Sequence, residues 1–144
     1  MEDQQKLAIL RKLDTKNIIE GIEKCENELE NELKKEADFK GQNYGYLCSE
    51  GRDCAEVKRI LAELSIKVPE AGDEGKKFTV ADRDAWLLRQ RKENEELDKA
   101  IIKQREVAFL LDDYQIKVEI AKKRLESRKV ILNLKTAQLN FLAS

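Results

Sequence analysis

Three cysteines are the residues of this chain whose type best suits metal or redox chemistry. Cys48 and Cys54 lie six positions apart in "CSEGRDC", and Cys25 stands alone. A zinc site needs about four ligands with closely paired cysteines, a redox pair favours the C-x-x-C spacing, and the chain has no histidine. We therefore expect no metal site, and a disulfide only under oxidising conditions. Cys48 and Cys54 are interpreted as small apolar residues beside a turn and a helix start.

No sequence motif points to catalysis. The absence of histidine removes the commonest general base and metal ligand. The chain also lacks a glycine-rich phosphate loop, a G-x-S-x-G motif and paired His/Glu metal motifs. Its many carboxylates recur at the spacing of charged helix faces, not within apolar runs that would raise their pKa. We expect a non-enzymatic protein without catalytic residues and without a cofactor.

Aromatic residues gather in the segment "GQNYGYL", where Tyr44 and Tyr46 alternate with glycine. Aromatic side chains beside flexible backbone can stack on bases or on peptide ligands. More often, such residues cover the open end of a helical bundle, and this is the interpretation that we favour. Tyr44 and Tyr46 remain the candidate partner surface of this segment.

A basic run near the C-terminus is the candidate anion or nucleic-acid face. Six bases could neutralise several phosphates, but apolar residues that require burial lie between them. The net charge of −1 also gives little long-range attraction to a polyanion. A solvated or acid-paired face is favoured, and nucleic-acid binding is the alternative function. The bases are Lys122, Lys123, Arg124, Arg128, Lys129 and Lys135.

The composition predicts an all-α fold in one domain. Of the 144 residues, 40% are charged and 41% hydrophobic, with one proline and six glycines, a balance typical of long helices and coiled coils. We predict an elongated helical bundle with helix 1 over residues 3–38, a short helix over 53–66 and a long helix over 79–142. Residues 39–78 form an irregular segment around the short helix. Two long helices joined by a central segment resemble the layout of prefoldin subunits, although 39–78 lacks their β-hairpin pattern.

Capping residues set the predicted helix starts. Asp53 is expected to cap the short helix, with Glu56 completing a capping box. Thr79 is the expected N-cap of the long helix, and Asp82 and Asp84 lie in its first turn, where the helix dipole favours acids.

A seven-residue repeat runs through the long helix. One core series starts at Leu97 and recurs every seven residues to Leu139, and an interleaved series starts four residues later at Ile101. The repeat passes Asn94 and Asp112–Asp113 without a change of phase. We therefore predict one unbroken helix of about 60 residues.

From about Ile116 onward, the face opposite the core series becomes apolar, so the helix requires neighbours on two sides. Helix 1 can cover one side, and the short helix is too short to cover the other. We therefore expect a homo-oligomer, with a dimer favoured, and a protein partner at the 39–78 end. The predicted interface consists of Ile116, Ile120, Leu125, Val130, Leu132, Leu134, Leu139 and Phe141.

The absence of targeting and membrane signals leads us to expect a soluble cytoplasmic protein. The start "MEDQQKLAIL" resembles neither a signal nor a transit peptide, and no stretch has the roughly 20 apolar residues of a membrane span. Residues 20–38 hold eight acids that can pair with the basic run, within one chain or across a dimer. The expected function is coiled-coil assembly as a scaffold, adaptor or regulator.

Overall fold

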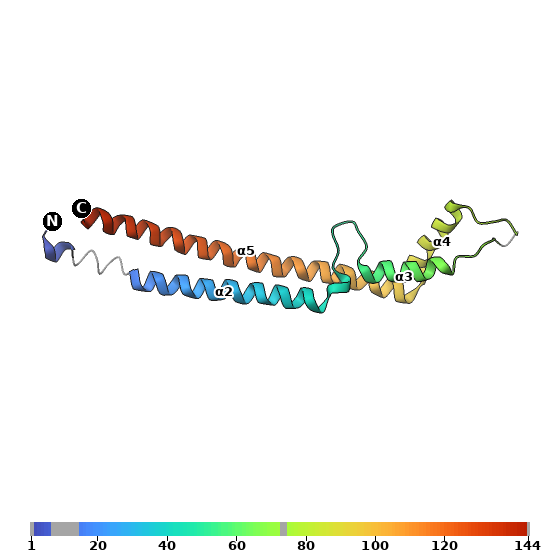
Figure 1. Cartoon of the computed structure of the whole chain (residues 1–144), viewed down its shortest axis with the longest axis horizontal. Coiled ribbons are helices and arrows are strands. Elements are labelled where there is room, and N and C mark those ends of the chain that lie inside the picture. Colours follow the sequence, from blue (N-terminus) through green and yellow to red (C-terminus); the bar gives the residue numbers. More distant parts are fainter. Residues whose placement is uncertain (1, 7–14, 73–74, 144) are drawn as a thin grey trace. The chain divides into compact units, whose positions relative to one another are not determined.

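The computed structural model describes residues 2–6, 15–72 and 75–143, and within these ranges the fold is all-α. The helices are α2 (Thr15–Gln42), the 3₁₀ turn η1 (Tyr44–Tyr46), α3 (Ala55–Ile66), α4 (Val80–Glu93) and α5 (Glu95–Ala143), shown in Figure 1. Residues 3–6 are also helical. The described residues form no strand, and their extended pairing is limited to one bridge between Ala71 and Lys77. The predicted all-α class is confirmed, and the part of the predicted helix 3–38 that spans residues 7–14 lies outside the described residues.

The chain divides into two compact units. The terminal unit comprises the described parts of residues 1–38 and 113–144, and the central unit comprises the described parts of 39–112. We describe each unit separately. The single domain expected from chain length stays a prediction.

The central unit has a closed apolar core. Helix α3 buries Val57, Ile60 and Leu64, whose three- and four-residue spacing places them on one face. This face packs against Leu97 and Ala100 at the start of α5. Leu97 and Val57 are both 0% exposed. Trp86 and Leu87 of α4 cover the edge of the same cluster, so three helices share this core.

Two polar contacts fix the entry to α3 within the central unit. The backbone N–H of Cys54 donates to Gln104 Oε1 at 2.7 Å. The Arg91 guanidinium donates two hydrogen bonds to the Asp53 carboxylate, at 2.7 and 3.3 Å. Asp53 is therefore not the N-cap that the sequence predicts. Cys54 occupies the cap position without a side-chain hydrogen bond, because the Asp53 carboxylate is engaged by α4 instead.

In the terminal unit, α2 lies beside the C-terminal part of α5 and runs in the opposite direction (Figure 1). Ile22, Cys25 and Leu125 form its buried cluster, against which Ile18, Leu29 and Leu132 pack. The acidic and basic blocks also meet here, because Arg124 Nη1 lies 2.6 Å from Glu28 Oε1. The burial of apolar side chains and the pairing of charge therefore agree in this register. Helix α2 continues to Gln42, four residues beyond the predicted end.

The prediction of one unbroken helix over 79–142 is wrong, because the helix is interrupted at Asn94. The N–H of Asn94 still bonds to the Gln90 carbonyl at 2.9 Å, so Asn94 closes α4. Its ψ of 116° then leaves the helical region. Its side-chain Oδ1 accepts from the Leu97 N–H at 3.0 Å, which starts α5 as an N-cap. The heptad count missed the break because it tests phase and not backbone geometry.

At the other end of α4, the predicted Thr79 cap is confirmed, with a complete capping box to Asp82.

The covered face of α5 follows the predicted Leu97 series but not its predicted companion. Buried residues also occur three positions after members of that series, at Ala100, Val107 and Ala121. The interleaved series starting at Ile101 is exposed from Ala108 onward. Alanine and valine at the second set of positions allow a neighbouring helix to approach more closely than bulkier residues would. Ala100 is buried in the central core, whereas the predicted Ile101 packs only at its edge.

None of the described helices is long and apolar enough to cross a membrane.

Candidate helix-docking surface

Within the terminal unit, α5 exposes a set of large apolar side chains. Phe141 is 78% exposed, Val130 64% and Ile120 45%. The remaining members of the set are Ile116, Ile131 and Leu134. No part of the described chain covers these side chains to the extent that Leu125 is covered.

These exposed residues form a stripe with coiled-coil spacing. Ile116, Ile120, Val130, Leu134 and Phe141 fall on positions separated by alternating three and four residues, with Lys123, Ser127 and Ala137 between them. We call the stripe defined by these eight positions the outer seam. The residues that face α2 follow the same alternation, and the outer seam lies on the opposite side of the helix. Helix α5 therefore has two seams, of which the described residues cover one.

The structure divides the eight predicted interface residues between these two seams. Leu125 is buried against α2, Leu132 packs on the same cluster, and Leu139 is half-buried. These three residues belong to the intrachain seam. The five exposed residues are those of the outer seam: Ile116, Ile120, Val130, Leu134 and Phe141.

Ion-paired residues flank the outer seam, and Lys123 is the one charged residue within it. Lys117 pairs with Asp113 at 3.1 Å, and Lys122 pairs with Glu119 at 3.4 Å, both along α5. The hydrogen bond from Lys117 to Asp113 raises the pKa of the lysine. Exposed pairs of this kind contribute at most about 1 kcal/mol each, so burial dominates the energetics of this surface.

The basic residues predicted as a nucleic-acid face do not share one face of α5. Lys122, Lys123 and Arg124 are consecutive, and successive residues on an α-helix point about 100° apart. Lys122 and Arg124 already pair with Glu119 and Glu28. Arg128 and Lys129 are exposed, and Lys135 is half-buried. Arg124, Arg128 and Lys135 lie within about 40° of one another around the helix, and the other three bases point in other directions.

The two tyrosines in the central unit have different environments. Tyr46 packs against the core, and Lys103 Nζ lies 4.4 Å from the centre of its ring. Tyr44 is 80% exposed. Gly45 between them approaches α3 closely, because a Cβ there would lie 3.2 Å from Glu56 Cγ. Tyr46 is thus a cap of the core, as the sequence favours, and only Tyr44 remains available to a partner.

The cysteines are free thiols in different environments. Cys25 and Cys54 are buried, each within its own unit, and Cys48 is exposed. Partial desolvation, followed by the nearby Cys54 and Asp53, raises the pKa of the Cys48 thiol, which lowers its reactivity as a thiolate. Across residues 2–6, 15–72 and 75–143, no cluster of three or more potential ligands is placed to hold a metal ion.

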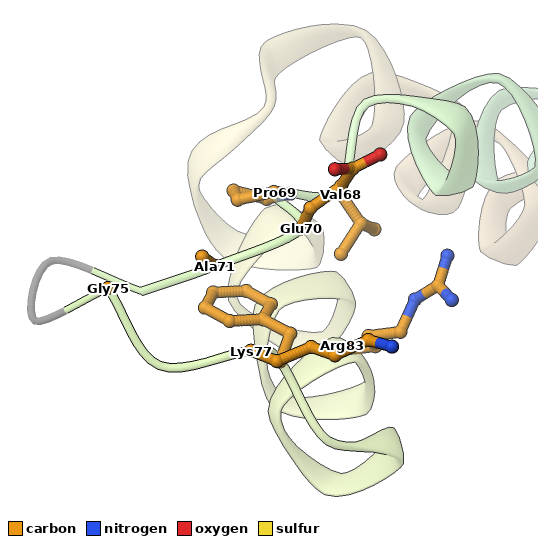
Figure 2. A pocket seen from close by; sticks show the side chains of 8 residues that line it. Val68, Pro69, Glu70, Ala71, Gly75, Lys77 and Arg83 are labelled. Atoms are coloured by element: carbon orange, nitrogen blue, oxygen red, sulfur yellow. The ribbon is translucent and has the colours of Figure 1, made fainter.

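A hollow of about 560 Å³ lies in the central unit between the two arms of the 68–78 loop and the start of α4. Figure 2 shows Glu70 on one arm, Lys77 on the other and Arg83 extending from α4. The loop is closed by hydrogen bonds from Gly72 N to Lys76 O and from Phe78 N to Glu70 O. Apart from Val68 and Phe78, the lining residues are exposed. A ligand held here would therefore keep much of its contact with water.

The central unit exposes apolar side chains of α5 that the sequence analysis did not single out. They are Ile102, Phe109 and Leu110, with Phe109 at 75% exposure. Ile102 and Phe109 lie seven residues apart, and Ile116 follows after another seven. Counting the repeat from the correct core pair, Leu97 and Ala100, would have identified these positions.

Comparisons with known proteins return no match: no protein-family model, no curated protein and no solved structure is similar to this chain.

Proposed function

We propose that this protein is a non-enzymatic assembly module whose terminal unit pairs with a second copy of the chain through the outer seam. The single observation that carries this proposal is the exposed apolar stripe at coiled-coil spacing on α5. Monomeric proteins rarely leave a large apolar patch exposed to water. An adaptor, scaffold or regulatory role follows from a module that assembles in this way.

Burial supplies the driving force for pairing. Complete burial of a valine, leucine, isoleucine or phenylalanine side chain contributes about 1.5–3 kcal/mol. Since these side chains are roughly half exposed, each would contribute on the order of 1 kcal/mol when a partner helix covers it. Contributions from both copies together reach the range of about 4–15 kcal/mol that association costs in lost freedom.

A second copy is favoured over an unrelated helix because the seam is self-complementary. Two antiparallel α5 helices can be related by a two-fold axis that passes beside residue 125. Ile116 of one copy then faces Leu134 of the other, and Ile120 faces Val130. Lys123 then faces the small, polar Ser127. A parallel, in-register pair would instead place Lys123 against its own copy, and like charges opposite each other are unfavourable. We therefore propose an antiparallel dimer.

Sedimentation equilibrium of Leu134→Glu tests the proposal. A carboxylate in the centre of one half of the seam would remain charged and unpaired after burial, so we expect dissociation to a monomer with unchanged helix content. Asn133→Glu is the matched control, because Asn133 is exposed on the neighbouring side of α5 and gains the same charge. Equal masses for the two variants would contradict the proposal.

Cysteine crosslinking tests the orientation. In a background with the exposed Cys48 changed to serine, the antiparallel dimer predicts that Lys123→Cys crosslinks to Ser127→Cys when the two variants are mixed. A parallel dimer predicts that Lys123→Cys crosslinks to itself. Dimers formed by Lys123→Cys alone would overturn the antiparallel arrangement while leaving self-association intact.

A further inference from the structure

A second feature of the terminal unit is a groove between α2 and α5. It encloses about 630 Å³. Its α2 wall consists of Gly21, Lys24, Cys25 and Glu28, and its α5 wall consists of Ile120, Lys123, Arg124, Ser127 and Arg128. The α2 residues fall at successive helical turns, so the groove follows the axes of both helices. A concave strip along two packed helices is the shape that accepts a third helix.

The groove carries an excess of positive charge. Glu28, its one acidic lining residue, is neutralised by Arg124 at 2.6 Å. Lys24, Lys123 and Arg128 form no ion pair within the described part of the chain. Three cations therefore stand along the groove without carboxylate partners. Charge complementarity favours an acidic occupant.

Gly21 gives a second, independent indication that another backbone approaches here. A glycine inside a helix is destabilising relative to alanine, and a close approach of another backbone is one use of a glycine. Among the described residues, a Cβ at Gly21 would meet only the Arg128 side chain, at 3.9 Å from Nη1, which is an ordinary contact. The fold of the terminal unit therefore does not require glycine at this position. A helix seated in the groove would use the space that the missing side chain leaves.

We propose that this groove binds an acidic amphipathic helix of another protein. Its apolar residues would contact the exposed part of Ile120 and the surface around Gly21, and its acids would pair with Lys24, Lys123 and Arg128. Helix binding is favoured over nucleic acid because the floor is apolar and small and because Glu28 lies in the wall. The proposal goes beyond self-association. Ile120, Lys123 and Ser127 also belong to the outer seam, so a helix in the groove competes with the second copy for them. Gly21, Lys24 and Arg128 lie outside the outer seam.

Fluorescence anisotropy with a designed peptide tests this proposal on the full chain. The probe is a labelled peptide of about 20 residues, long enough to be helical, with leucine along one face and glutamate along both flanks. We expect saturable binding that weakens between about 50 and 300 mM NaCl, because salt screens exposed charges. The same peptide with lysine in place of glutamate should not bind.

Two variants locate the binding. Lys24→Glu combined with Arg128→Glu should weaken binding at least about tenfold, because each new glutamate would repel a peptide acid that the original cation attracts. Lys34→Glu combined with Lys129→Glu is the control, because it makes the same charge change at exposed positions on the same two helices outside the groove. Gly21→Leu should weaken binding at high and low salt alike, by filling the groove, without loss of helix content.

Three outcomes would overturn the proposal. They are no saturable binding of the acidic peptide, equal losses in the groove and control pairs, and binding of a DNA duplex that depends on Lys24 and Arg128 while the peptide does not bind. Measuring the solution mass of the Lys24→Glu/Arg128→Glu variant shows whether a failure of peptide binding is separate from a failure of the dimer proposal. That variant should remain a dimer if the outer seam pairs as proposed.

Discussion

The central and terminal units are both built on α5, but they differ in how completely they bury their side chains. The central unit closes a core in which Cys54, Val57, Leu97 and Ala100 are at most 5% exposed. In the terminal unit, the cluster of Ile22, Cys25 and Leu125 retains 8–9% exposure, and of the described residues only the small side chains of Val118 and Ala121 are buried to 3% or less. Three helices contribute to the first core, whereas two helices contribute to the second.

Polar groups show the same difference. In the central unit, the Cys54 N–H and the Asp53 carboxylate each have a short hydrogen bond. In the terminal unit, Glu32 Oε2 is buried without a hydrogen-bond partner in the described residues. A two-helix unit leaves apolar and polar groups incompletely satisfied, because a pair of helices encloses little interior. The terminal unit is therefore the one for which we propose assembly.

Leucine truncation at equivalent seam positions should give the largest effect. Leu97→Ala removes a side chain with 0% exposure and should lower the free energy of unfolding by about 3–5 kcal/mol. Leu125→Ala removes a less completely buried one and should cost about 2–3 kcal/mol. Urea unfolding followed by circular dichroism measures both. A larger loss for Leu125→Ala would break the comparison, because it would make the terminal core the better packed of the two.

Removal of the Gln104 side chain should have an intermediate effect. Gln104→Ala leaves the buried Cys54 N–H without its acceptor, which should cost about 1–3 kcal/mol. Gln115→Ala is the control, because Gln115 is exposed on the same helix and its loss should change stability by less than about 0.5 kcal/mol. Similar unfolding midpoints in urea for the two variants would show that the Cys54–Gln104 bond does not hold the entry to α3.

The smallest predicted effect is a pH dependence carried by Asp53. The hydrogen bonds from Arg91 lower the pKa of Asp53. A carboxyl with a lowered folded-state pKa stabilises the fold above its unfolded pKa of about 3.9, and this contribution is lost as pH falls through the folded value. Because both side chains are partly exposed, it should not exceed about 1 kcal/mol.

Asp53→Asn should therefore reduce stability at neutral pH and make the loss of stability in acid shallower. Asp112→Asn is the control, because it makes the same charge change at an exposed position of the same unit, far from a helix N-terminus, and it should leave the acid profile unchanged. Identical acid profiles for wild type and Asp53→Asn would contradict the assignment.

Sequence pattern predicted the fold class, the Thr79 cap and the Leu97 core series, because apolar periodicity and capping chemistry are local properties. It could not predict the interruption at Asn94, since an asparagine can either continue a helix or cap the next one. The choice between Ala100 and Ile101 as the second core position depends on how closely another helix approaches. Such tertiary distances are not encoded in hydrophobicity alone.

The candidate surface was only partly predictable for the same reason. Excess apolar residues on α5 indicated a second face, and five of the eight predicted interface residues lie on it. Assigning Leu125, Leu132 and Leu139 to the intrachain seam required knowing which side α2 covers. The groove combines Gly21 and Lys24 with residues about one hundred positions later in the chain, so no local signal could identify it.

Light scattering on a sizing column under reducing conditions tests the central claim most directly. The chain has a mass of 16.7 kDa, and the account predicts twice that mass for the wild-type protein, with dissociation on dilution. A mass equal to that of one chain at all concentrations would contradict it, because the outer seam would then remain exposed to water without a second copy.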